Sequence, residues 1–65
     1  MIRDFVEPEL EYFRSQCNFT PDELEYFNLK AKDYSNVQIA MKMVVSSAQV
    51  SKLAKRVKDK MKRVL

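Results

Sequence analysis

The sequence predicts a small all-α domain of four helices. Three observations predict it: a chain of only 65 residues, apolar side chains that recur every three to four positions, and three helix-capping signatures that begin at Thr20, Ser35 and Ser46. A chain of this length accommodates a single domain, residues 1–65. Within it, we expect residues 1–18 to form a helical N-terminal extension to a core of residues 19–65.

The N-terminal extension is predicted to hold one helix that begins at Arg3 or Glu7 and ends at Gln16. Pro8 fits only the first turn of such a helix or a kink, because proline lacks the N–H that a helix interior needs. We expect this extra helix to cover the core or to mediate self-association. Its apolar positions recur every three to four residues: Phe5, Val6, Leu10, Phe13 and Cys17.

The second helix is predicted over residues 21–32. Thr20 and Glu23 flank a proline in the pattern of a capping box, in which each side chain accepts a backbone N–H of the other residue. Phe19 and Leu24 occupy the positions of a hydrophobic staple. We expect Leu24, Phe27 and Ala31 to be buried, with Tyr26 or Leu29 on the flank.

The third helix is predicted over residues 36–43, after a capping box formed by Ser35 and Gln38. Its inward-facing residues are expected to be Val37, Ile39 or Ala40, and Met43, and the methionines are expected to fill the core.

The fourth helix is predicted over residues 47–63, after a third capping box of Ser46 and Gln49. It carries an apolar stripe and, opposite it, a polar and cationic face. The stripe consists of Val50, Leu53, Ala54, Val57, Met61 and Val64, and the opposite face of Ser51, Lys52, Lys55, Arg56, Lys58, Lys60 and Lys62.

Composition excludes several function classes. The chain has no glycine and no histidine, and Cys17 is its one cysteine. Glycine-rich phosphate loops and EF-hand turns need glycine, and zinc fingers, Cys/His nucleophile pairs and internal disulfides need residues that are absent here. We therefore expect a protein that is not an enzyme and that carries no cofactor and no metal. The unpaired cysteine and the lack of a signal peptide point to the cytoplasm, and no apolar run is long enough to span a membrane.

Charge is divided unevenly along the chain. Residues 1–28 hold seven acidic and two basic residues, a net charge of −5, whereas residues 29–65 hold ten basic and two acidic residues, a net charge of +8. This division favours a C-terminal half that binds a polyanion and an N-terminal half that stays away from it.

The last two predicted helices and the turn of about three residues between them have the order of a helix-turn-helix. Ala40, Val45 and Val50 supply the small or apolar residues that the crossing of two such helices needs. In a DNA-binding helix-turn-helix, the first turns of the second helix enter the major groove, where Gln49 suits adenine and Lys52 suits guanine. The candidate DNA-binding residues are Ser46, Ser47, Gln49, Ser51 and Lys52, with Lys42, Lys55, Arg56 and Lys58 expected on phosphates.

Three segments carry a resemblance to a known family. Residues 19–27 read FTPDELEYF, residues 35–40 read SNVQIA, and residues 45–51 read VSSAQVS. In this order and without gaps they resemble the LuxR/GerE-type DNA-binding domain, and region four of bacterial sigma factors is similar as well. The resemblance covers about residues 19–62 and implies a helix-turn-helix that binds double-stranded DNA.

The chain departs from that family in several places. Asp33 and Tyr34 stand where the LuxR-type domain has a glycine before its scaffold helix, and Lys30 occupies a position that is usually apolar. The fourth, dimerising helix of the LuxR-type domain has no counterpart, so in this respect sigma region four is the closer likeness. The N-terminal helix belongs to neither pattern.

Other interpretations of the basic helix are weighed against DNA binding. A cationic face is often only a solvated face, and Gln49 can serve as the reciprocal partner of its capping box instead of a base contact. A membrane-surface helix is disfavoured, because the apolar face of residues 47–65 lacks tryptophan and phenylalanine and the rest of the domain would lose its core partner. A protein–protein adaptor or anti-repressor without DNA binding of its own is the stronger alternative.

Taken together, the sequence predicts sequence-specific double-stranded DNA binding by a small prokaryotic transcriptional regulator, with RNA polymerase or another regulator as a further partner. A single helix-turn-helix makes few contacts with DNA, and proteins of this kind usually bind paired half-sites as dimers. We therefore expect a homodimer whose contact surface includes Phe5, Val6, Leu10 and Phe13.

Overall fold

A computed structural model describes residues 2–65, apart from the side chain of Arg3. Over these residues the chain forms a short 3-10 helix, η1 (Ile2–Asp4), and four α-helices: α1 (Glu7–Gln16), α2 (Pro21–Ala31), α3 (Asn36–Met43) and α4 (Ser47–Val64). The prediction of an all-α, four-helix domain is confirmed. The predicted bounds of α2, α3 and α4 each lie within one residue of the observed bounds.

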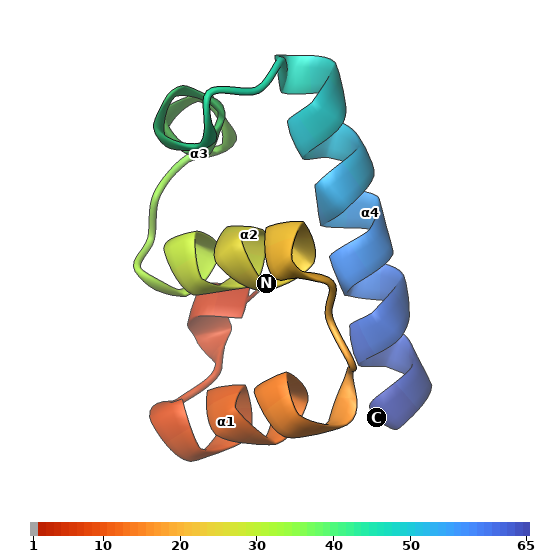
Figure 1. Cartoon of the computed structure of the whole chain (residues 1–65). Helices are drawn as coiled ribbons and strands as arrows, with labels where there is room; N and C mark the ends of the chain where they lie inside the picture. The colour runs from red at the N-terminus through yellow and green to blue at the C-terminus, as the bar shows by residue number, and fades with distance from the viewer. Residues whose placement is uncertain (1) are drawn as a thin grey trace.

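α4 runs along one side of the molecule, and the other helices lie against it from the opposite side (Figure 1). α2 lies against the middle of α4, α3 lies beside the first turns of α4, and α1 lies near its C-terminal end. α3 is seen end-on where α4 is seen from the side, so the two helices cross steeply. The turn between α3 and α4 and the helix α1 thus occupy opposite ends of the molecule.

The core forms where α2, α3 and α4 meet. Phe27 of α2 and Ile39 of α3 are fully buried, and the predicted stripe of α4 faces them. Full burial of one such side chain stabilises a fold by about 1.5–3 kcal/mol, so this stripe is a main source of stability. Its buried members are Val50, Leu53, Val57 and Met61, and Ala54 and Val64 are partly buried beside them.

The helix caps follow the prediction closely. Thr20 and Ser35 each form a complete capping box: Thr20 Oγ1 accepts the Glu23 N–H at 3.3 Å and Glu23 Oε1 accepts the Thr20 N–H at 3.0 Å. For Ser35 and Gln38 the two distances are 3.2 and 2.9 Å. Such caps satisfy N–H groups that have no partner inside the helix.

A chain without glycine still has three residues in the left-handed region: Asn18, Asp33 and Val44, with φ of 53°, 70° and 57°. Asp33 is one of the two residues that stand in place of the LuxR-type glycine. It ends α2 in a Schellman motif, in which the Tyr34 N–H bonds Leu29 O at 3.3 Å. Asparagine and aspartate tolerate this conformation, but a β-branched valine is strained in it.

The extension made by η1 and α1 covers one end of the core. The ring of Phe13 lies 4.9 Å from that of Phe5 and 6.4 Å from that of Phe27 of α2, measured between centroids. Arg14 joins α1 to α2, since its Nε donates to Asn28 Oδ1 at 2.9 Å while its guanidinium bonds Glu7 and Glu11. The hydrogen bonds that Arg14 donates to Glu7 and Glu11 raise its pKa, and the bond to Glu7 contributes most.

Several predicted burials are wrong. Leu24 is only half-buried, and Tyr26, which was expected on the flank, is buried in its place. Val37 was expected to face inward but is 69% exposed, and Met41 is 74% exposed instead of filling the core. The pattern within one helix does not show which neighbouring helix crosses it. Here the face of α3 that packs against the core contains Ile39 and not Val37.

Candidate nucleic-acid interface

The turn between α3 and α4 consists of residues 44–46. Val44 ends α3 in the left-handed conformation, and the next N–H, of Val45, bonds Ala40 O at 3.0 Å. Together these close a second Schellman motif, which fixes the direction in which the chain leaves α3. Val45 and Ala40 are partly buried against the core, and Val50 follows fully buried in α4. The two helices are therefore held in one relative orientation.

The first turns of α4 present small polar side chains to solvent. Ser46 is the N-cap, and its Oγ accepts the Gln49 N–H at 3.1 Å. The third predicted capping box is only half formed, because the Gln49 side chain does not bond back to the Ser46 N–H. The Gln49 side chain is half-buried and takes no part in the cap. Ser47, Ser51 and Lys52 are exposed, as is Ala48 between them.

Three further cations follow along α4. Lys55, Arg56 and Lys58 are all exposed, and within residues 2–65 none of them forms an ion pair with a carboxylate. From Ser47 to Lys58 the helix rises about 17 Å, at 1.5 Å per residue. A surface of this length, with small residues at its start and unpaired cations beyond, is complementary to a charged groove.

Lys42 lies apart from this helix face. It is exposed on the last turn of α3, and its ammonium lies 4.9 Å from the centroid of the Tyr34 ring. This cation–π contact holds the side chain beside the link that precedes α3.

Lys60 does not belong to the solvent-exposed basic face, contrary to the prediction. Its Nζ lies 2.5 Å from Glu23 Oε1 and also donates to Asn18 O at 3.2 Å. Lys60 is therefore one partner of a structural ion pair. No periodicity within α4 distinguishes it from Lys58, because its partner is 37 positions away in the sequence.

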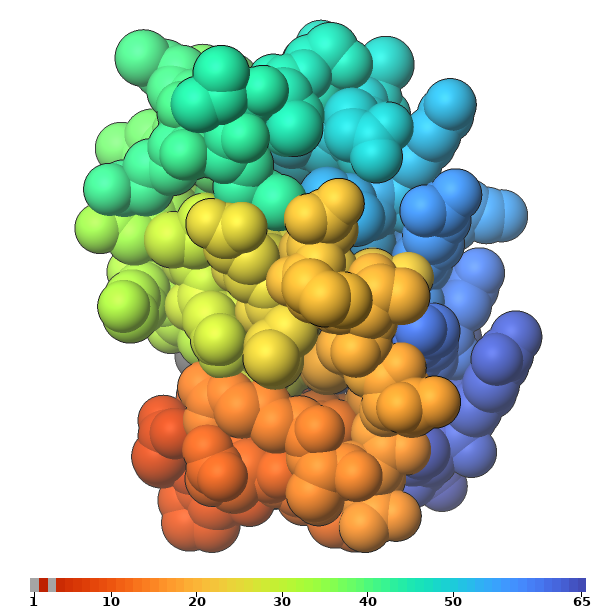
Figure 2. Space-filling model, in the orientation of Figure 1, coloured from red at the N-terminus to blue at the C-terminus, as the bar shows by residue number. Residues whose placement is uncertain are grey.

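The glutamates of α1 lie away from the α3–α4 turn. Figure 2 shows α3, the turn and the start of α4 forming one end of the molecule, with α1 at the other. α1 holds Glu7, Glu9 and Glu11, all exposed, and two of them bond Arg14. The acidic helix α1 and the α3–α4 turn therefore lie at opposite ends of the molecule.

The predicted dimer surface is not available as a whole on the folded chain. Leu10 and Phe13 lie in the core at 5% and 2% exposure, since α1 packs inward against α2 and α4. Phe5 is half-buried against Phe13, and Val6 remains exposed at 63%.

One polar cluster was not predicted. Tyr26 OH and Lys30 Nζ both donate to Asn36 Oδ1, at 3.2 and 3.3 Å, and this links α2 to the first residue of α3. The signal for it in the sequence was the lysine at position 30, where the resembled family is usually apolar. Burial raises the pKa of Tyr26.

No protein-family model matches the chain, and neither curated proteins nor solved structures give a match. Over the described residues, no helix combines the length and the apolar character that crossing a membrane requires.

Proposed function

We propose that the protein binds double-stranded DNA sequence-specifically, as a small prokaryotic transcriptional regulator, with the first half of α4 in the major groove. One observation carries the proposal: the exposed face of α4 combines small side chains in its first turns with cations that have no carboxylate partner. A major groove of B-DNA is wide enough to admit an α-helix, and close approach needs small residues at the front.

Each residue has a proposed role. Gln49, whose side chain takes no part in the cap, and Lys52 contact base edges, with Ser47 and Ser51 beside them. The N-terminal end of α4 at Ser46 favours a phosphate, because its backbone N–H groups and dipole attract an anion. Lys42, Lys55, Arg56 and Lys58 neutralise further phosphates. The resemblance to LuxR-type domains and to sigma region four supports this assignment of roles.

The position of the acidic helix α1 supports the same orientation. With the α3–α4 end on DNA, the carboxylates of α1 lie at the far end of the molecule, where their repulsion from phosphates is weakest. The cytoplasmic location expected from the single cysteine is part of the proposal.

A second candidate, a protein–protein adaptor, is favoured by a different surface. Val37 and Met41, exposed at 69% and 74%, are four residues apart and so lie on one side of α3, and Val44, exposed at 88%, follows directly after the helix. Exposed apolar patches often mark protein interaction sites. RNA polymerase or another regulator is the kind of partner proposed for it, either alongside DNA binding or in its place.

A homodimer also remains part of the proposal. Since Leu10 and Phe13 are buried within the single chain, a dimer at this end has to use exposed side chains, among them Tyr12 of α1 and Val6, its N-cap residue. Sedimentation equilibrium tests it: a chain that stays monomeric at high micromolar concentration contradicts the dimer.

The decisive experiment is selection of bound sequences from a random duplex library at low salt, followed by fluorescence anisotropy with the selected duplex. We expect enrichment of one motif, and an affinity that falls steeply as salt increases, because phosphate contacts release counterions. No enrichment together with no duplex binding at low salt contradicts the proposal. In that case, a stable complex with another protein identifies the adaptor.

A further inference from the structure

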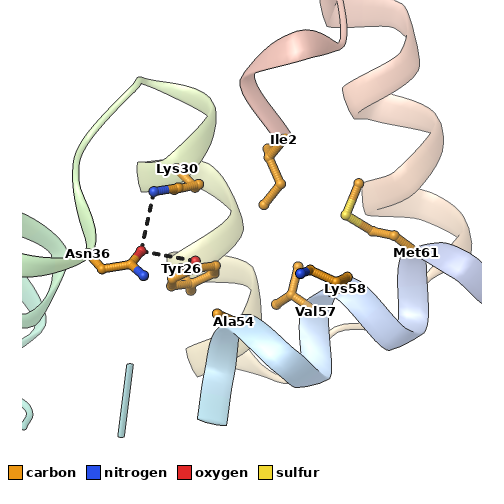
Figure 3. Close-up of a pocket in the computed structure, with 8 residues that line it drawn as sticks. All are labelled: Ile2, Tyr26, Lys30, Asn36, Ala54, Val57, Lys58 and Met61. Atoms are coloured by element: carbon orange, nitrogen blue, oxygen red, sulfur yellow. Dashed lines mark hydrogen bonds between the residues drawn. The ribbon is translucent and has the colours of Figure 1, made fainter. Parts of the chain in front are cut away.

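A hollow between α2, α4 and η1 is lined by residues that the proposed DNA interface largely leaves unused. Its volume is about 210 Å³. Figure 3 shows Ile2 facing α4 across the hollow, with Lys30, Asn36 and Tyr26 on one side and Met61 on the other. The remaining lining residues are Ala54, Val57 and Lys58 of α4.

The lining has two chemically different parts. Ile2, Ala54, Val57 and Met61 form an apolar wall. The polar part holds the ammonium groups of Lys30 and Lys58 and the hydroxyl of Tyr26, and it includes no carboxylate. A hollow with a net positive lining and an apolar wall is complementary to an anion that carries an apolar body.

The donors of the polar part are not all used within the protein. Asn36 Oδ1 accepts from both Tyr26 and Lys30, which leaves the Asn36 amide N–H groups without a partner among the described residues. Lys30 has three N–H donors and uses one of them on Asn36. Lys58 has no ion-pair partner within residues 2–65. A carboxylate near Lys30, Asn36 and Lys58 would therefore find donors ready to bind it.

A lysine at position 30 is unexpected beside this apolar wall. The resembled family is usually apolar at this position, and an apolar residue there would continue the wall of Ile2 and Met61. Lys30 instead places an ammonium group at the edge of this wall, where it can pair with a bound anion.

We propose that this hollow binds a small amphiphilic carboxylate, with its apolar body against Ile2, Ala54, Val57 and Met61 and its carboxylate between Lys30, Asn36 and Lys58. The volume of the hollow is that of about seven molecules of liquid water, at about 30 Å³ each. A body of roughly six carbon atoms fits it, which makes a short-chain or aromatic monocarboxylate the ligand class.

Binding there is expected to oppose DNA binding, and this part rests on the proposed function. Lys58 lines the hollow and is also a proposed phosphate contact. A carboxylate that engages its ammonium competes with the phosphate, so ligand and duplex weaken each other's binding by the same factor.

The first experiment involves no DNA and uses hexanoate as the probe. Methyl shifts of Ile2, Ala54, Val57 and Met61 are followed in ¹H–¹³C spectra during titration, with hexanol, hexylammonium and acetate as comparison compounds. We expect saturable shifts at these four residues with a Kd of about 1 mM, as is usual for so few atoms. Hexanol and hexylammonium are expected to bind at least several-fold more weakly, and acetate not at all.

Matched variants make this test specific. Lys30→Met keeps the apolar stem and removes the charge, and it should weaken hexanoate binding at least fivefold. Lys32→Met removes the same charge from an exposed residue outside the hollow and should leave the binding unchanged. Diffuse or absent shifts overturn the proposal, and so does equal binding of hexanol or equal behaviour of the two variants.

The second experiment measures duplex affinity in hexanoate and in acetate at equal ionic strength. We expect a several-fold weaker affinity in hexanoate for the wild type and little difference for Lys30→Met, which leaves the proposed DNA contacts intact. Equal affinity in both salts overturns the competition. Saturable methyl shifts in a protein that binds no duplex contradict only the proposed function, so the two failures are distinguishable.

Discussion

Glu23 and Lys60 form an ion pair that joins the start of α2 to the C-terminal half of α4, with 2.5 Å between Oε1 and Nζ. Glu23 is 3% exposed, and its Oε1 also accepts the N–H of Thr20, its capping partner. Lys60 donates a second bond to Asn18 O, in the link that connects α1 to α2. Three segments of the chain therefore meet at one carboxylate.

The pair also changes the acidity of Glu23. Burial by itself raises the pKa of this carboxyl group, but hydrogen bonds from Lys60 and from the Thr20 backbone lower it more, so the net shift is downward. The charged form is the one that the fold stabilises, because two donors converge on it.

Replacing Glu23 by glutamine is expected to destabilise the fold by about 2 kcal/mol. Breaking a fully buried pair costs about 3–5 kcal/mol, and the value is reduced here because the Lys60 side chain keeps 24% exposure. For a domain of this size, that is a large part of the whole stability. Urea unfolding followed by circular dichroism measures the effect. Glu25→Gln, on an exposed residue of the same helix, is the control, and equal midpoints for the two variants contradict the prediction.

Acid is expected to weaken the fold through the same residue. The pKa of Glu23 in the folded chain lies below its ordinary value of 4.5, so the unfolded chain binds more protons around and below that pH. The contribution of Glu23 is therefore complete above about pH 5 and is lost as the pH falls through the folded pKa. Urea midpoints measured from pH 7 to pH 3 should fall more steeply for the wild type than for Glu23→Gln. Parallel curves would exclude Glu23 as the cause.

Val44→Gly is expected to stabilise the protein. Valine in the left-handed region costs about 1–2 kcal/mol, and glycine removes that cost at an entropic penalty of about 0.5–1 kcal/mol. The side chain is 88% exposed and contributes little packing. We expect a gain of about 0.5–1 kcal/mol, seen as a Tm higher by roughly 4 °C. Val37→Gly, also exposed but helical, should lower the Tm, and a lower Tm for both variants refutes the strain at Val44.

Lys55→Ala combined with Lys58→Ala is expected to weaken binding to every duplex sequence. Each lost phosphate contact removes about 0.9 from the slope of log K against log salt, so the slope should fall by nearly two units. Fluorescence anisotropy at several salt concentrations measures it. Lys62→Ala with Arg63→Ala removes the same charge from the end of α4 and should change the slope less. An equal change in both double variants places the interface elsewhere.

Lys52→Ala is expected to alter sequence preference. A good base contact discriminates by about 1–3 kcal/mol, so its loss should relax the preference at one base pair of the selected motif. Lys55→Ala, at a proposed phosphate contact, should weaken binding without changing the motif. Repeating the duplex selection with both variants compares them directly, and an unchanged motif for Lys52→Ala removes that residue from base contact.

Much of the local structure could be predicted from the sequence: where α2, α3 and α4 begin, which residues cap them, and which stripe of α4 is buried. Capping depends on residues three positions apart, so Thr20 with Glu23 and Ser35 with Gln38 could be recognised without any knowledge of the fold. The stripe of α4 was equally clear, because a long helix repeats its pattern over several turns. The exposed basic residues of the candidate interface followed from the same periodicity.

Contacts between side chains of different helices could not be predicted from the sequence and are seen in the folded chain alone. The fold paired Lys60 with Glu23, buried Tyr26 in place of Leu24, and turned Val37 outward. It also placed Leu10 and Phe13 in the core and brought Lys30 beside Asn36. The physical reason is that a short helix has several faces of similar hydrophobicity, and the helix that crosses it determines which face loses contact with water.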